Sequence, residues 1–290
     1  MTGKEIYQGT KKFPFRLFIL RIICAGGALV WFAILGFIGL AIKSGGLIYG
    51  AALSGLVLYA IASSVVENYI GYMFKYGAVH AIAMAYTTGQ VSPTYFDDSV
   101  NYIKGSFVKA NVYLVVDRLV NAAVRGVTKL VDFVISFLPD NIKSFVNTFI
   151  NIYLNYIDEC CLAYSMIHSD ENIAKSSCDG IVLYYQNAKG MLMPALKTSI
   201  RVVLVDGAVF LLGFVLLFVF PPLGILAWLV GYSVVTPFLT HRVLCDTMVA
   251  YLAYATANEV RNDLYGTLMK VNPFKKLYNK QVDPAFQRAA

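Results

Sequence analysis

The chain has 290 residues, of which 58% are hydrophobic and only 14% are charged. A soluble domain carries about 25% charged residues, so this composition argues against a soluble globular enzyme and predicts an integral membrane protein. The net charge of +7 would suit a nucleic-acid partner, but the distribution of the charge argues against one.

Basic residues flank the apolar region of the chain, whereas the tight turns within the hairpins hold only Lys43 and Lys143. The flanking residues precede the first apolar segment and follow the last one, as Lys4, Lys11, Lys12, Arg16 and Arg21, and then Arg261, Lys270, Lys275, Lys276, Lys280 and Arg288. This distribution follows the positive-inside rule. We therefore expect a multi-pass protein with both termini in the cytoplasm, lipid as a partner and no nucleic acid, in a membrane that the pattern does not identify.

Long apolar segments group into three pairs. Ile22–Ile42 and Ser44–Val66 contain no charged residue, and each is about the ~20 residues that a helix needs to cross a bilayer. The clearest pair is Arg201–Asp263, in which Pro221 and Pro222 form the corner. The sequence therefore predicts an all-α, polytopic fold with about six transmembrane helices in three hairpins, whose long second arms project into the cytoplasm.

The predicted organisation has five parts. They are a basic cytoplasmic N-terminus (1–16), a first hairpin (17–88), a second hairpin led by an amphipathic segment (89–168), a third hairpin led by another (169–262), and a basic cytoplasmic tail (263–290). The tail is expected to be peripheral or partly disordered.

The first hairpin turns at Lys43–Gly46. Its second arm is longer than a bilayer is thick, so it must project from the membrane or bend, near Gly71 or Gly77. The motif Gly46-xxx-Gly50 and the small residues Ala51, Ser54 and Gly55 could let another helix approach closely, although such motifs are also common by chance.

The first arm of the second hairpin carries a polar stripe. Its members recur every three or four residues, and they are Asp117, Asn121, Arg125, Thr128 and Asp132. A valine stripe that includes Val120 lies beside it. Such a helix can face lipid on one side and a wet or protein interior on the other.

An internal repeat relates the second and third hairpins. Residues 114–117 resemble residues 203–206, and the segment from Asp158 to Tyr164 resembles the segment from Asp246 to Tyr251 at nearly the same spacing. Repeats of this kind are frequent in transporters, where sites form between the repeats.

Ionisable groups at membrane depth are costly and therefore point to function. Tyrosine is abundant, with 20 residues, and tyrosine rings with a carboxylate can hold an organic cation. Interfacial aromatic belts, interhelical ion pairs and boundary positions are the alternatives, and a boundary position is favoured for Asp158, Glu159 and Asp246. The candidate solute-pathway residues are Asp117, Asn121, Arg125, Asp132, Asp206, Tyr156, Tyr251 and Tyr254.

Motifs of soluble enzymes are absent from the sequence. It has no Gly-x-Ser-x-Gly, no phosphate-binding loop and no His-Glu-x-x-His, and its five cysteines show no metal-like spacing. The run from His168 to Glu171 could bind a metal in principle, although a polar loop is the more ordinary interpretation. We expect no enzyme activity, no catalytic residue, no metal and no cofactor.

Four short segments carry a family resemblance. They are Arg201–Asp206, Asp246-Thr247, Arg261–Asp263 and Tyr102–Ser106. Across about residues 92–266 the chain resembles the core of the choline transporter-like family, and this resemblance implies movement of choline or a similar amphiphilic cation.

These observations favour a membrane protein that moves a small solute, such as choline or another organic cation. The alternative is a membrane scaffold or assembly protein that binds partners through its long helices and basic tail. Either could be a homo-oligomer or bind a membrane-protein partner.

Overall fold

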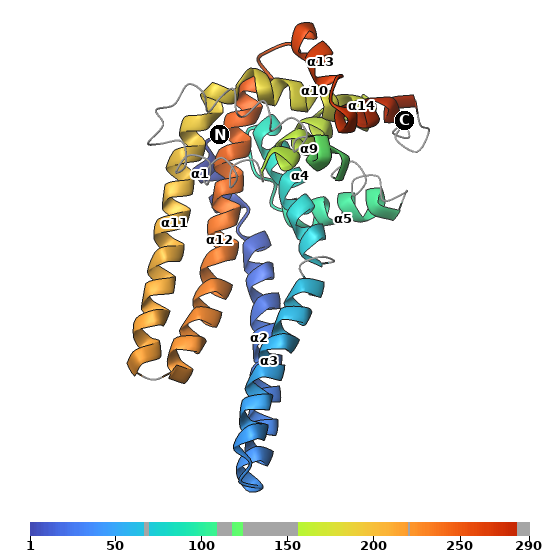
Figure 1. The fold of residues 1–290 in the computed structure, drawn as a ribbon. Coiled ribbons are helices and arrows are strands. Elements are labelled where there is room, and N and C mark those ends of the chain that lie inside the picture. The colour runs from blue at the N-terminus through green and yellow to red at the C-terminus, as the bar shows by residue number, and fades with distance from the viewer. Residues whose placement is uncertain (67–69, 109–117, 124–155, 220, 283–290) are drawn as a thin grey trace. The chain divides into compact units, whose positions relative to one another are not determined.

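The computed structural model describes residues 1–66, 70–108, 118–123, 156–219 and 221–282 (Figure 1). Every regular element within these ranges is a helix, so the predicted all-α class is confirmed for them. The chain forms two compact units. Unit 1 comprises residues 1–11, 76–204 and 240–290, and unit 2 comprises residues 12–75 and 205–239.

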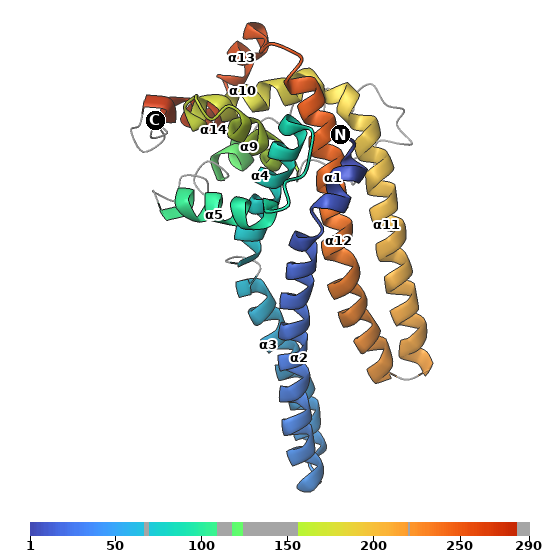
Figure 2. The same ribbon diagram turned by 180° about the vertical axis from the view of Figure 1, so that it is seen from behind.

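In unit 2 the first two long helices form a hairpin. Helix α2 (Lys12–Ala41) and helix α3 (Gly45–Val66) lie side by side in both views (Figures 1 and 2). Lys43 ends α2 in the left-handed region, with φ 54°, and the Ser44 N–H donates to the Gly39 carbonyl at 2.8 Å. This is the hydrogen bond of a Schellman cap, in which glycine is the usual left-handed residue and lysine stands here.

Of the small residues that the sequence offers for a close helix approach, Gly55 lies at the contact of α3 with α2, whereas a Cβ on Gly46 or Gly50 would meet no atom within 4 Å. A Cβ on Gly55 would lie 3.3 Å from the Ala28 carbonyl oxygen and 3.7 Å from the Phe32 Cβ, so this face of α3 has no room for a larger side chain. The Trp31 Nε1–H donates to the Ser54 hydroxyl at 3.0 Å, which fixes the register of the two helices.

The second hairpin of unit 2 comes from helices α11 (Ala188–Val219) and α12 (Pro221–Ala255). Its corner falls at the prolines, as predicted, because a proline is tolerated in the first turn of a helix. Phe210 stacks on Trp228 with ring centroids 5.7 Å apart, and the Trp228 Nε1–H donates to the Phe210 carbonyl at 3.0 Å. A side chain on Gly213 would overlap this indole, so that glycine makes room for the ring.

Unit 2 exposes large apolar side chains. Phe37 is 75% exposed, Leu40 67% and Phe218 76%. Water would make such a surface costly. Among the residues that the structure describes, one helix, α2, meets the length and composition of a membrane span.

The N-terminal segment folds onto α12 within unit 1. Helix α1 (Gly3–Gly9) begins with a capping box in which Thr2 and Glu5 satisfy each other's backbone N–H. Past α1, the Thr10 Oγ1 lies 2.7 Å from the His241 Nε2 of α12, and both residues are buried. The predicted basic N-terminus therefore includes a folded helix.

The long second arm of the first hairpin divides into two helices. Helix α3 ends at Val66 and helix α4 (Tyr72–Thr88) begins directly after Gly71, whereas Gly77 lies inside α4. A turn with Gly89 at φ 73° leads to helix α5 (Tyr95–Val108), the amphipathic segment that the sequence predicts up to about Lys104.

His80 joins α4 to α5. Its ring stacks on Tyr102 with centroids 4.1 Å apart, and its Nδ1 lies 2.9 Å from the Ser99 Oγ. Burial lowers the pKa of His80 to about 4, and the neighbouring Asp98 offsets only part of that effect. The folded state therefore holds a neutral imidazole, whereas the unfolded chain takes up a proton near pH 6.5.

This difference predicts a dependence of stability on pH. The contribution of His80 is complete above about pH 6.5 and is lost as the pH falls toward 4, because only the unfolded state binds the proton in that window. We expect a loss of about 3 kcal/mol from this residue by pH 4. Thermal unfolding of the wild type and of His80→Gln across this range checks it. An equally steep acid loss in both proteins would contradict the assignment.

Helices α9 (Ile157–Ile167) and α10 (Ile173–Gln186) form the hairpin at the centre of unit 1. Asn172 caps α10, and its side-chain oxygen accepts from the Ala174 N–H at 2.9 Å. Its amide also donates to the Gln281 carbonyl at 3.0 Å, which ties the cap to the C-terminal end of the described chain.

Replacing Asn172 with alanine removes both interactions. Loss of an N-cap side chain costs about 1 kcal/mol, and loss of the second hydrogen bond adds about the same. We expect Asn172→Ala to lower the free energy of unfolding by about 2 kcal/mol, as measured by thermal unfolding. Asn172→Asp keeps the capping oxygen and should recover roughly half, and equal losses in the two variants would contradict the cap.

The C-terminal segment is folded against α10. Helices α13 (Asn262–Leu268) and α14 (Asn272–Asn279) and the 3₁₀ turn Lys280–Val282 lie beside it (Figure 1). Phe274 and Leu277 of α14 are fully buried. Of the expected alternatives, a peripheral or a partly disordered tail, residues 263–282 are not disordered, because apolar side chains among the lysines anchor the segment.

Candidate functional site

Three helices of unit 1 cross at one glycine. A Cβ on Gly180 of α10 would lie 3.1 Å from the Cys161 Cα of α9 and 3.1 Å from the Tyr251 hydroxyl of α12. The Tyr251 hydroxyl donates to the Gly180 carbonyl at 2.9 Å, and the Tyr251 ring lies 5.9 Å from the ring of Tyr184. The sequence candidate Tyr251 is thus a fully buried packing residue that holds α12 against α10.

Two carboxylates are buried at the start of α9. Asp158 is 4% exposed and Glu159 is 2% exposed. Their place in the first turn favours negative charge, because the helix dipole is positive there. Asn121, a member of the polar stripe, donates its side-chain amide to the Asp158 Oδ2 at 2.9 Å. The stripe therefore meets a pair of acidic side chains in the protein interior.

The helical segment 118–123 explains this contact. Val120 and Ala123 are fully buried, while Asn121 is half-buried and Arg118 is exposed. Val120 belongs to the valine stripe, and the sequence allows that stripe to face lipid. In the structure Val120 is buried against protein.

Cys160 and Cys161 directly follow the two carboxylates in α9 and do not form a reactive site. Cys160 and Cys161 are fully buried. Burial is the main cause that raises the pKa of both thiols well above the ordinary value, and the nearby acidic groups raise it further. Both remain protonated at neutral pH, so neither can act as a thiolate nucleophile.

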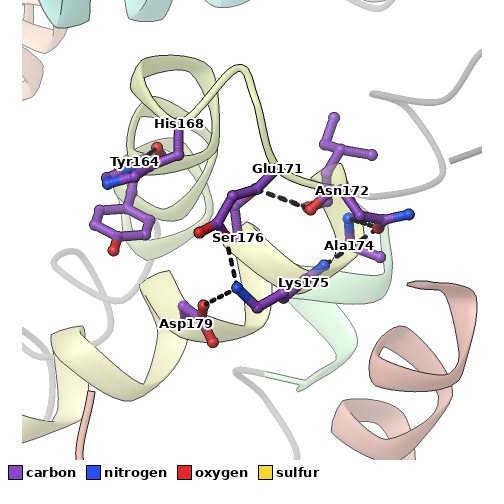
Figure 3. Close-up of polar contacts among 9 residues, drawn as sticks. Tyr164, His168, Glu171, Asn172, Ala174, Lys175, Ser176 and Asp179 are labelled. Carbon is purple, nitrogen blue, oxygen red and sulfur yellow. Dashed lines mark hydrogen bonds and ion pairs between the residues drawn. The ribbon is translucent and has the colours of Figure 1, made fainter. Parts of the chain in front are cut away.

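A second polar cluster lies on the exposed side of α9 and α10 (Figure 3). Lys175 lies between two carboxylates, 3.0 Å from the Glu171 Oε2 and 3.8 Å from the Asp179 Oδ2. The hydrogen bond to Glu171 raises the pKa of Lys175, and burial raises the pKa of Asp179. The ammonium group links the segment just before α10, at Glu171, to Asp179 within the helix.

The run from His168 to Glu171 has a structural role here. The ring of His168 lies against Tyr164, with centroids 4.0 Å apart, and its Nδ1 lies 2.9 Å from the Tyr164 carbonyl oxygen (Figure 3). Glu171 is engaged by Lys175. Within the described ranges no group of three potential ligands is arranged for a metal ion.

Tyr164 and His168 also line an open hollow of about 580 Å³ in unit 1. The other residues of its wall are Met1, Tyr86, Thr87, Ile167, Ala255, Thr256 and Asn258. Burial raises the pKa of Tyr164 to about 12, with smaller contributions from Asp179 and Glu171. Tyr86 and Tyr164 bring two tyrosine rings to this wall, and tyrosine rings can hold an organic cation.

The remaining sequence candidates are scattered. Tyr156 directly precedes α9 and is half-buried, and Tyr254 is half-buried on α12. Asp206 lies on α11 within unit 2, and Asp117, Arg125 and Asp132 fall outside the described residues. Asn121 and Tyr251 each form a side-chain hydrogen bond to another helix, Asn121 to Asp158 and Tyr251 to Gly180.

Sequence reasoning placed Asp158, Glu159 and Asp246 at the membrane boundary. Asp246 is half-buried and pairs with Arg242 one turn away, at 3.0 Å. Asp158 and Glu159 are buried in the core of unit 1. The adjacent cysteines are the only sequence signal for this burial, because cysteine is among the most buried residue types.

Comparison of the chain with models of protein families, with curated proteins and with solved structures found no match.

Proposed function

We propose that this chain is a multi-pass membrane protein, with about six spans in three hairpins, that moves a small organic cation such as choline. The observation that carries the proposal is the contact between Asn121 of the polar stripe and the buried Asp158 carboxylate. Two acidic side chains in apolar surroundings attract a cation and repel an anion. By their three- to four-residue spacing in the sequence, Asp117, Arg125 and Asp132 are expected to belong to the same polar path as Asn121.

The aromatic hollow supports a cationic solute. Helix α9 carries the carboxylates Asp158 and Glu159 at one end and Tyr164 at the other, where the hollow opens. A cation can be held there by the rings before it reaches the carboxylates. No step of this proposal needs an enzyme activity, a metal or a cofactor.

Uptake into liposomes that contain the purified protein tests the proposal. We expect protein-dependent flux of radiolabelled choline or another quaternary ammonium ion, which an excess of unlabelled cation inhibits. We also expect Arg125→Ala and Asp132→Ala to reduce the flux. No flux of any organic cation, together with tolerance of both substitutions, would contradict the proposal.

A membrane scaffold is the second candidate. The observation that favours it is the folded C-terminal segment, which presents a fixed surface instead of a loose tail. A protein partner that co-purifies in stoichiometric amount, in the absence of any flux, would support the scaffold over the transporter.

A further inference from the structure

Residues 259–282 form a C-terminal strap that runs along α10. At one end, the Gln186 side chain of α10 donates to the Glu259 carbonyl at 3.0 Å and accepts from the Arg261 N–H at 2.8 Å. At the other end, the Asn172 amide donates to the Gln281 carbonyl at 3.0 Å. The strap is therefore held at both ends of α10.

Aromatic packing fixes the middle of the strap. The Tyr265 ring meets Phe274 and Tyr278 edge-on, with centroids 5.5 and 5.8 Å apart. Phe274 and Leu277 of α14 are fully buried. The apolar face of α14 is thus used inside unit 1 and is not available for insertion into a membrane.

The outer side of the strap is basic. Lys270, Lys275 and Lys276 are exposed, and Lys280 follows one turn later. No acidic residue occurs between Leu264 and Val282, and Asp263 pairs with Arg261. The strap therefore holds a concentrated positive charge on a folded surface.

We propose that this lysine surface binds the headgroups of anionic phospholipids. Because the sequence from Leu264 to Val282 contains lysines and no acidic residue, we expect a negatively charged partner. Lysine ammonium groups are compact point charges that suit phosphate oxygens. Helix α2 is long and apolar enough to cross a membrane, so anionic headgroups are the phosphate source at high local concentration. The inference does not depend on solute movement.

Native mass spectrometry of the full chain in a neutral detergent tests this surface. The protein is titrated with short-chain phosphatidylserine, phosphatidylinositol bisphosphate and phosphatidylcholine, and the lipid-bound fraction is measured. We expect adducts with the two anionic lipids and few with phosphatidylcholine. The triple variant K270Q/K275Q/K276Q should weaken anionic-lipid binding on the order of 10- to 100-fold at low salt.

A charge-matched control separates this surface from net charge. The variant K4Q/K43Q/K104Q removes three exposed lysines elsewhere, and it should bind anionic lipid like the wild type. Equal losses in the two variants, or equal binding of phosphatidylcholine, would overturn the proposal. If inositol hexakisphosphate competes with the lipid at equal concentration, the proposal is overturned in favour of a soluble phosphate ligand. If polyglutamate binds and lipid does not, the proposal is overturned in favour of an acidic protein partner. Circular dichroism checks that each variant keeps its helices.

Discussion

Replacing Asp158 with asparagine is expected to reduce uptake of an organic cation by about 10- to 100-fold, equivalent to about 1.4–2.8 kcal/mol. The substitution keeps the shape of the side chain, and its amide oxygen can still accept from Asn121, which now donates at 2.9 Å. Only the negative charge is lost. Because Asp158 is 4% exposed, little water screens that charge in the native protein.

Liposome uptake measures the effect, and Glu159→Gln should act in the same direction. Asp97→Asn is the matched control, because Asp97 is an exposed carboxylate of α5. Its uptake should equal that of the wild type. A neutral analogue of the solute, if it is carried at all, should respond less to Asp158→Asn than the cation does. Unchanged cation flux in both Asp158→Asn and Glu159→Gln would contradict a role for these two carboxylates in the pathway.

The substitution Gly180→Val is expected to lower the free energy of unfolding by about 2–3 kcal/mol. Already the first added carbon would lie 3.1 Å from the Cys161 Cα, which is backbone and cannot rotate away. The two further methyl groups of valine would push α9 or α12 off α10. Thermal unfolding in detergent should show a midpoint lower by several degrees.

The control for this site is Gly105→Val in α5, where a Cβ meets no atom within 4 Å. That variant should unfold at or near the wild-type temperature. Tyr251→Phe removes the oxygen that a Cβ at position 180 would approach at 3.1 Å. The cost of Gly180→Ala should therefore be smaller in the Tyr251→Phe background than alone. Additive costs would show that the Tyr251 hydroxyl does not limit the space at Gly180.

Local chemistry accounts for the elements that the sequence predicted well. The proline corner at Pro221, the α2–α3 turn and the amphipathic α5 all follow from residues close together in the chain. The close approach at Gly55 follows as well, because a small residue in an apolar helix marks a contact. Pattern alone was sufficient in these places.

The burial and the contacts of the charged and aromatic residues were harder to predict. Tyr251 fits a cation cage as well as it fits a packing role, and only its hydrogen bond to Gly180 shows the packing role. Asp158 and Glu159 have the pattern of boundary groups, yet they are buried. The tail has a disordered composition, yet Phe274 and Leu277 anchor it against unit 1.

The sequence by itself determined the all-α class, the apolar hairpin helices and their turns, because length, hydropathy and proline or glycine position act within one or two helices. Only the tertiary structure decided that Asn121 meets Asp158, that Gly180 is the crossing point of three helices, and that residues 259–282 form a strap. These contacts join residues far apart in the chain, such as Asn172 with Gln281. Burial and charge at such contacts depend on which helices meet, which no local pattern contains.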